Sequence, residues 1–271
     1  MKDWLLHKVS YSMTESQREI EVKFCVRRPP PAFSHLPKIR NGILRKFLYS
    51  FPRIWGRPGG GLIQPRTLEV NLRFDNPEGE LTKARRTLRL RKDNEARLTY
   101  KDGGQTIKGA ISRREIEFVV SDFEAAEQFI EALGYETVFI YEKYRTTYEV
   151  EGRGGLTSLK GLKSLTSPTG RKSPKSLTSP TGLRSLMAKI MVDELPYGNF
   201  VEIEGDLEML RPIAKELGLD WSKAIPASYF MLFERLKKAR RLKFRDLTFE
   251  NFKGIKVMPE EMGIEYADRQ K

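Results

Sequence analysis

The chain has 271 residues, with 49 Lys or Arg, 36 Asp or Glu, two His and one Cys, and its formal net charge is +13. This length suffices for one large or two small globular domains, while the lone Cys25 excludes a disulfide framework, and two His make His-rich metal sites and serine-histidine triads poor candidates. No run of 18 or more apolar residues occurs and the N-terminal residues lack a signal-peptide pattern, so we expect no transmembrane segment and a reducing, cytoplasmic location.

Short strands separated by turns dominate the predicted elements. Alternating apolar and polar residues indicate the strands, and apolar residues three or four positions apart indicate helices. In chain order the predicted strands are residues 18–26, 67–75, 85–92, 96–102, 111–120, 138–150, 189–193 and 199–205. The predicted helices are residues 121–133, 206–217 and 226–241. The expected fold is therefore α+β and β-dominated, with peripheral helices.

Two segments interrupt this pattern and carry the positive charge. Residues 27–66 hold nine Lys or Arg and residues 152–189 hold eight, with no acidic residue in either segment. The octapeptide KSLTSPTG occurs at 163–170 and again at 175–182, and its composition cannot build a packed core. We therefore expect insertions at 27–66 and 152–187, the second of them disordered. The alternative is that these insertions bind an anionic partner such as nucleic acid or lipid.

Several predicted strands collect charged residues on one face. Successive side chains of a strand point to opposite faces, so the segment REIEVKF at 18–24 places Glu19, Glu21 and Lys23 together, opposite an apolar face. The same spacing recurs in other strands, where the pairs are Arg89 and Arg91, Glu115 and Glu117, Lys143 and Arg145, and Glu202 and Glu204.

An open sheet with a solvated face does not explain why pairs of acids and pairs of bases occupy separate strands. A closed barrel of about eight strands has an interior that side chains fill or that holds a small ligand. Charges inside it must be neutralised by one another or by a ligand, because an unpaired buried ion is destabilising by several kcal/mol. An interior with both signs suits a polyphosphate together with its metal ions.

These residues also resemble a known family. The segment EIEVK at 19–23 is similar to the Glu-x-Glu-x-Lys signature of the CYTH superfamily, also called triphosphate tunnel metalloenzymes. Four further segments resemble that family's motifs in the same order: TLRLRKDNEARLTYK, SRREIEF, YEKYRTTYE and MVDELPYGNFVEIEGD. The resemblance covers roughly 18–26, 67–151 and 188–235, and both insertions fall at strand connections.

The resemblance implies a closed antiparallel eight-stranded barrel whose tunnel binds a triphosphate with Mg²⁺ or Mn²⁺. It implies catalytic roles for Glu19, Glu21, Lys23 and Arg91. It implies phosphate binding by Lys23, Arg89, Arg91, Lys101, Lys143 and Arg145. It implies metal binding by Glu19, Glu21, Glu117, Asp193, Glu202 and Glu204. Hard divalent cations prefer carboxylate oxygen, and Arg suits bidentate contact with phosphate, so the residue types agree with these roles.

Three functions stay open at this stage. The first is hydrolysis of inorganic triphosphate, thiamine triphosphate or a nucleotide, which needs only the triphosphate group that the motifs specify. The second is cyclisation of ATP to cyclic AMP and pyrophosphate, which also needs a bound adenosine, for which no residues are identified in the sequence. The third is non-catalytic binding of polyphosphate or nucleic acid through the basic insertions. We favour hydrolysis.

The expected domain organisation is a lead-in at 1–17, a CYTH tunnel domain at 18–245 with the two insertions, and a tail at 246–271 that packs outside the barrel. Lys223 and the pair Ser228 and Tyr229 lie where the family's last helix closes one end of the tunnel, although an ordinary helix start explains them equally well. Cys25 shares the inward face of Glu21 and Lys23, and we expect it to be a small buried thiol.

Overall fold

The structure is a computed structural model, and it describes residues 18–28, 60–153 and 185–269. The lead-in at 1–17, most of the two basic insertions and both copies of KSLTSPTG lie outside the described residues. In the part that is described, no helix is long and apolar enough to cross a membrane.

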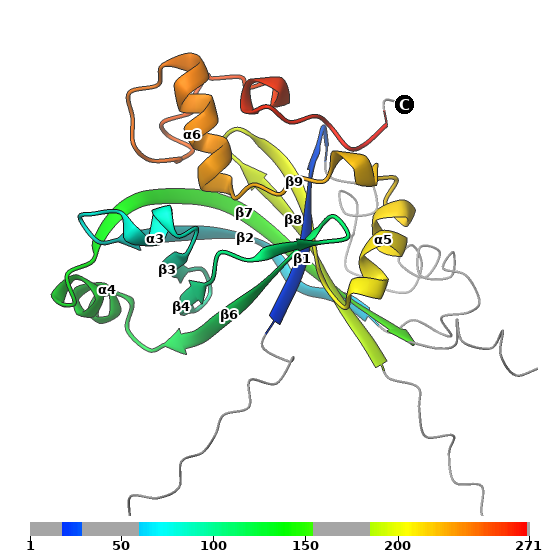
Figure 1. Cartoon of the computed structure of the whole chain (residues 1–271), viewed down its shortest axis with the longest axis horizontal. Coiled ribbons are helices and arrows are strands. Elements are labelled where there is room, and N and C mark those ends of the chain that lie inside the picture. Colours follow the sequence, from blue (N-terminus) through cyan, green and yellow to red (C-terminus); the bar gives the residue numbers. More distant parts are fainter. Residues whose placement is uncertain (1–17, 29–59, 154–184, 270–271) are drawn as a thin grey trace, which may run out of the picture.

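The described elements are nine strands and several short helices (Figure 1). The strands are β1 (Arg18–Val26), β2 (Gly60–Asp75), β3 (Thr87–Lys92), β4 (Ala96–Lys101), β5 (Gln105–Ile107), β6 (Ala110–Val120), β7 (Glu136–Arg153), β8 (Ser185–Leu195) and β9 (Gly198–Gly205). The α-helices are α3 (Glu80–Lys83), α4 (Phe123–Ala132), α5 (Leu207–Glu216) and α6 (Tyr229–Arg240). Two 3₁₀ turns, η4 (Trp221–Lys223) and η5 (Pro259–Met262), complete the set.

Eight of these strands close on themselves. Neighbouring strands pair in the order β1-β9-β8-β7-β2-β3-β4-β6, and β6 pairs back with β1 through Arg18 opposite Arg114 and Glu21 opposite Ile111. Every pairing between the described strands is antiparallel, and among these strands β5 is attached only to β6. The predicted β-dominated fold with an antiparallel, eight-stranded ring is confirmed.

Two boundaries differ from the sequence prediction. Strand β2 begins at Gly60 and β8 begins at Ser185, so residues 60–66 and 185–187, which the sequence places in the insertions, belong to long strands. These ends pair with β7, where Leu62 lies opposite Tyr148 and Leu186 lies opposite Gly152. Pairing with a neighbouring strand stabilises residues whose local Gly, Pro and Ser content predicts a loop.

Two short elements were not predicted. The helix α3 has four residues and β5 has three, which is too short to produce a recognisable period in the sequence. The turn after α3 contains Arg85 at φ 58°, a left-handed conformation that non-glycine residues seldom adopt.

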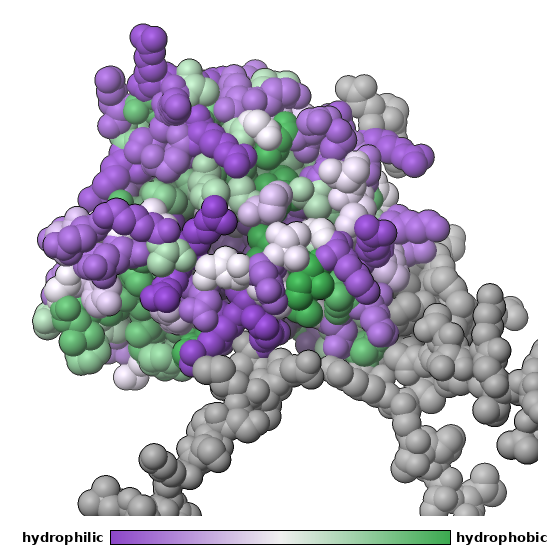
Figure 2. All heavy atoms as spheres, in the orientation of Figure 1, coloured by the Kyte–Doolittle hydropathy of each residue, from purple (hydrophilic) through white to green (hydrophobic). Residues whose placement is uncertain are grey.

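The outward faces of the strands pack against two helices, α4 and α5. Helix α5 covers apolar residues of β1, β8 and β9, including Phe24 and Ile203, while α4 packs beside Leu90 and Leu72. Both helices begin after an acidic residue, and Asp122 accepts a hydrogen bond from the N–H of Ala125 at the start of α4. Figure 1 shows α4 and α5 on opposite sides of the ring of strands, and Figure 2 shows a group of hydrophobic residues over α4.

Helix α6 and the tail cover one end of the ring (Figure 1, top). Leu232, Phe233 and Leu236 of α6 pack against Cys25 and Phe139, which lie on the inward faces of β1 and β7. The tail adds backbone hydrogen bonds, because the N–H of Leu247 donates to the carbonyl of Ile140 at 2.9 Å and that of Ala267 donates to Cys25 at 2.8 Å. The apolar cluster around α6 therefore closes this end.

Candidate active site

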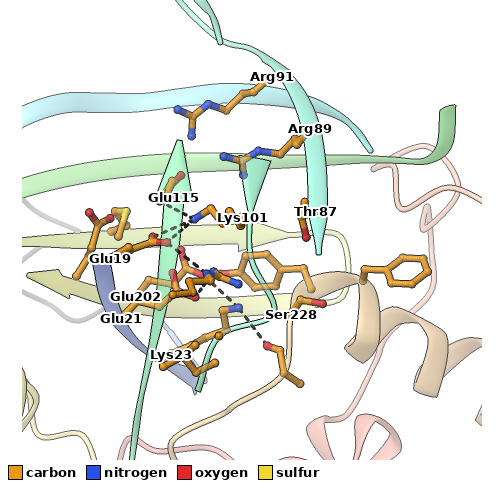
Figure 3. Close-up of a pocket in the computed structure, with 18 of the residues that line it drawn as sticks. Glu19, Glu21, Lys23, Thr87, Arg89, Arg91, Lys101, Glu115, Glu202 and Ser228 are labelled. Carbon is orange, nitrogen blue, oxygen red and sulfur yellow. Dashed lines mark hydrogen bonds and ion pairs between the residues drawn. The ribbon is translucent and has the colours of Figure 1, made fainter. Parts of the chain in front are cut away.

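The inward strand faces surround a charged cavity of about 770 Å³. Of the residues predicted from the sequence, those that line it are Glu19, Glu21, Lys23, Arg89, Arg91, Lys101, Glu117, Lys143, Arg145, Glu202 and Glu204. Asp193 lies directly behind this lining and is fully buried. Figure 3 shows Glu19, Glu21 and Glu202 close together, with Arg89 and Arg91 projecting from β3 on another side. The structure thus brings residues from seven strands to one site.

Strand register explains this convergence. On β1 and β9, Glu21 lies opposite Glu204 and Lys23 lies opposite Glu202. On β7 and β8, Arg145 lies opposite Asp193. Alternate residues of a strand share a face. If one residue of a strand points into the ring, the residues two positions before and after it therefore point inward as well.

Asp193 is the centre of a buried network. It accepts hydrogen bonds from Arg145 Nε at 2.6 Å, from Lys143 Nζ at 3.0 Å and from the hydroxyl of Tyr229 at 2.7 Å. Arg145 also bonds to Glu202. Asp193 therefore orients Lys143 and Arg145, two candidates for phosphate binding. It lies behind the lining of the cavity, whereas the resemblance implies that it binds metal.

The carboxylate of Glu202 is held in its charged form. Its partners are Lys23 at 3.2 Å and Arg145. Burial alone raises the pKa of Glu202, but Lys23 and Arg145 together bring it well below its usual range.

A second network lies at the start of β1. Lys101 Nζ is 2.8 Å from Glu19 and 3.1 Å from Glu115, and Arg113 is 2.5 Å from Glu21 and 3.3 Å from Glu19. Burial raises the pKa of Glu21 and the charge of Glu19 raises it further, while Arg113 opposes this shift. These acids are crowded in a buried region, and the neighbouring bases neutralise their charge incompletely.

Glu204 faces the same region from β9. Burial raises its pKa, and the charges of Glu19 and Glu21 raise it further. Lys189 and Lys101 lower the pKa but do not cancel the increase. Glu19, Glu21 and Glu204 therefore repel one another across two neighbouring strands.

The chemistry of these donors fits a hard divalent cation. Carboxylate oxygens are the ligands that Mg²⁺ and Mn²⁺ prefer, and a cation would remove the repulsion among the three acids. In the conformation of the described residues, no three acidic, His or Cys side chains converge as a finished metal site. Glu19 and Glu21 instead contact Arg113, and Glu19 also contacts Lys101, so metal binding would require those bases to shift.

The third part of the cavity is rich in Arg. Arg91 Nη2 is 3.2 Å from Glu117, and Arg89 is 3.5 Å from the same carboxylate. Glu117 also accepts a hydrogen bond from Thr99 at 2.8 Å. Burial raises the pKa of Glu117, yet Arg91 and Arg89 lower it overall.

These Arg side chains have unused donors. The Nε atoms of Arg73, Arg89 and Arg91 are buried without a hydrogen-bond partner in the described residues. Burial and the neighbouring charge of Arg89 lower the pKa of Arg91. Since unpaired buried donors are destabilising, this wall is suited to accept the oxygens of an anion.

Sequence reasoning missed several lining residues. Glu69 is 1% exposed and lies 3.3 Å from Lys143 and 3.9 Å from Arg91, and these bases outweigh burial and lower its pKa to about 2. Arg113 shares the parity of Glu115 in SRREIEF, so its inward position could have been recognised from spacing. Glu69 and Arg73 share a face of LEVNLRF, but that face has no repeated charge of one sign.

Of the residues singled out near the start of α6, Tyr229 and Ser228 line the cavity and Lys223 does not. Tyr229 is buried, and Lys23 Nζ lies 4.0 Å from the centre of its ring, so Tyr229 belongs to the site. Ser228 lines the cavity and caps α6 by accepting a hydrogen bond from the N–H of Met231. Lys223 pairs with Glu265 of the tail at 2.5 Å and does not line the cavity. The buried thiol of Cys25 has a pKa raised to about 12 by burial, in agreement with an inert role.

Comparison with solved structures found distant similarities. A "putative adenylate cyclase" of Vibrio parahaemolyticus is 16% identical, with a TM-score of 0.49, over 79% of this chain and 95% of that one. A Pyrococcus horikoshii protein is 18% identical, with a TM-score of 0.45, over 80% and 99%. A "putative adenylyl cyclase" from Hippeastrum with a dominant triphosphatase activity is 16% identical, with a TM-score of 0.40, over 80% and 95%. No curated protein matches the chain.

The family comparison is more decisive. The family model of the CYTH domain matches residues 43–209, which is more than half of the 271 residues. The match includes Arg89, Arg91, Asp193 and Glu202, while β1 with Glu19 lies before it. The sequence motifs, the closed ring of strands and this match agree: the chain belongs to the CYTH domain family.

Proposed function

We propose that this protein hydrolyses a triphosphate inside the charged barrel with the help of Mg²⁺ or Mn²⁺. The observation that carries the proposal is the excess of buried, incompletely paired Arg donors around the cavity, with repelling carboxylates on another part of its wall. An anion with several phosphate groups, bound with divalent cations, neutralises both regions at once.

The bases would hold the triphosphate. Arg89 and Arg91 present two guanidinium groups from one strand face, which suits bidentate contact with phosphate oxygens. Lys143 and Arg145 are oriented by Asp193 and Glu69, and Lys23 is fixed by Glu202 and the carbonyl of Ala227 at 3.2 Å. These fixed charges stabilise negative charge that develops on the transferred phosphoryl group without having to reorganise.

The carboxylates would hold the cations. Glu19, Glu21 and Glu204 are the best candidates because they repel one another, with Glu202 beside them on β9. When bound, the cation supplies neutralisation of phosphate charge and a more acidic water for the attack. The acids of the chain would then release Lys101 and Arg113 toward the substrate. Glu117 is bonded to Arg89 and Arg91, and in this proposal it positions those bases.

The test is product analysis with purified protein, inorganic triphosphate, thiamine triphosphate and ATP, each with Mg²⁺ or Mn²⁺. Orthophosphate, pyrophosphate and cyclic AMP are measured together in the protein and in Glu19→Gln. Glu124→Gln is the matched control, since Glu124 is exposed on α4 and pairs with Lys92 outside the cavity. We expect orthophosphate release that Glu19→Gln abolishes and Glu124→Gln preserves.

Other outcomes identify the alternatives. Cyclic AMP with an equal amount of pyrophosphate would identify an adenylate cyclase instead. No product with any substrate would overturn the enzymatic proposal and favour a binding module. Deletion of residues 163–182 tests the nucleic-acid-binding alternative. A protein that uses this basic segment to bind nucleic acid would lose affinity for nucleic acid, and its binding would depend less on salt concentration.

A further inference from the structure

One end of the cavity has a different chemistry from the rest. Beneath the start of α6 the lining changes from ion pairs to aromatic, hydroxyl and guanidinium groups. The residues of this end, which we call the α6 recess, are Arg73, Thr82, Arg85, Thr87, Ser228, Phe230 and Met231. Figure 3 shows Thr87 and Ser228 on the side of the cavity away from Glu19 and Glu21. Inorganic triphosphate has no organic group that could contact such a surface.

Flat surfaces for stacking form one wall of the α6 recess. The guanidinium carbon of Arg73 lies 4.3 Å from the centre of the Phe230 ring. Phe230 in turn meets Phe139 edge to face at 5.0 Å, and Phe139 stacks on Tyr141 at 5.5 Å. Hydrogen bonds from Arg73 to Thr82 at 3.1 Å and to the carbonyl of Arg86 at 3.3 Å fix the plane of the guanidinium. Heterocyclic bases stack on both aromatic rings and Arg guanidinium planes.

Hydroxyl groups lie between this wall and the phosphate-binding bases. Thr87 and Arg89 are two residues apart on the same face of β3, which corresponds to roughly 7 Å along a strand. Ser228 adds a second hydroxyl from the start of α6. A sugar placed beside Thr87 and Ser228 would have its attached phosphates directed toward Arg89.

The charge of the α6 recess restricts the organic group further. It contains Arg73 and Arg85 and no carboxylate in its lining. The nearby Asp75 points elsewhere, because its carboxylate accepts hydrogen bonds from the N–H groups of Leu81 and Thr82. Two guanidinium groups repel a cationic ring such as the thiazolium of thiamine and tolerate a neutral purine or pyrimidine.

We propose that the α6 recess binds the nucleoside of a nucleoside triphosphate, with the base against Phe230 and Arg73, the sugar near Thr87 and Ser228, and the phosphates extending to Arg89 and Arg91. This inference rests on the proposed function, since it assigns the substrate class of the same cavity. It predicts that the protein prefers a nucleoside triphosphate to both thiamine triphosphate and inorganic triphosphate.

The test compares affinities by calorimetry in the presence of Mn²⁺. The probes are the β,γ-imido analogues of ATP and thiamine triphosphate and the diimido analogue of inorganic triphosphate, which resist hydrolysis during the measurement, applied to the full chain. We expect the ATP analogue to bind at least tenfold more tightly than either of the others. Phe230→Ala should reduce this preference about tenfold, as expected for the loss of one stacking surface.

Two further variants keep the result interpretable. Phe230→Leu retains an apolar side chain in the first turn of α6 and should also reduce the preference. Phe129→Ala removes an aromatic ring that is 63% exposed on α4 and should leave the preference unchanged. Equal affinity for the ATP analogue and inorganic triphosphate overturns the inference, even if triphosphate is hydrolysed. Tighter binding of thiamine triphosphate overturns it as well. If no triphosphate binds or reacts, the proposed function fails together with it.

Discussion

The hydroxyl of Tyr229 donates a hydrogen bond of 2.7 Å to Asp193 Oδ2, which connects the first residue of α6 to the C-terminal part of β8 inside the barrel. The same aromatic ring lies 4.0 Å from Lys23 Nζ and 5.5 Å from Lys143 Nζ. One side chain thus couples the helix that closes the barrel to the bases that would hold phosphate.

Replacement of this hydroxyl should weaken the closed end. We expect Tyr229→Phe to lower the free energy of unfolding by about 2 kcal/mol, because the lost hydrogen bond ends on a buried carboxylate. Urea denaturation measures the change. Tyr135→Phe is the matched control, since Tyr135 packs near α4 away from the cavity. Equal stability of Tyr229→Phe and the unmodified protein would contradict the role assigned to this bond.

Glu69 makes the stability of the protein dependent on acid pH. Its pKa in the folded protein is about 2, so its stabilising effect is present above the pKa of the unfolded chain, near 4.5. The effect disappears as the pH falls toward 2, and a shift of this size corresponds to about 3 kcal/mol. Glu69→Gln should therefore be less stable at pH 6, and the difference from the unmodified protein should shrink at pH 3. A difference that is independent of pH, measured by urea denaturation, would refute this assignment.

Arg91 should favour function at the expense of stability. Burial and Arg89 lower its pKa, which means that the fold disfavours its charged form. We expect Arg91→Met, which keeps the length of the chain without the charge, to bind inorganic triphosphate at least tenfold more weakly. Its melting temperature without ligand should be no lower than that of the unmodified protein. Loss of both properties would show that Arg91 is needed for folding.

Glu204 should limit stability until a cation binds. Its crowding with Glu19 and Glu21 predicts that Mn²⁺ raises the melting temperature of the unmodified protein. Glu204→Gln should have a higher melting temperature without metal and a smaller response to Mn²⁺. Glu208→Gln serves as the control, because Glu208 is exposed in the first turn of α5. An identical response in Glu204→Gln would remove Glu204 from the set of metal ligands.

The sequence alone predicts eight of the nine described strands and indicates which strand faces carry charge. Alternation has a period of two, so the spacing of Glu19, Glu21 and Lys23 assigned all three to one face, and the structure places all three on the cavity. Recurrence of this pattern in β3, β6, β7 and β9 indicated a shared interior. It could not reveal short elements such as α3 and β5, whose form depends on neighbouring strands.

Which charged side chains contact one another depends on how the strands pair. Glu69 and Lys143 are distant in sequence, and their contact follows from the register of β2 and β7, where they lie directly opposite each other. Likewise Asp193, to which the resemblance gives a role in metal binding, lies behind Lys143 and Arg145, because β8 pairs with β7 at Arg145. The α6 recess combines β2, α3, β3 and α6, and residues from such distant elements share no local period. A period of two along one strand predicts which residues share a face. A contact between residues of different strands depends on how the whole barrel closes.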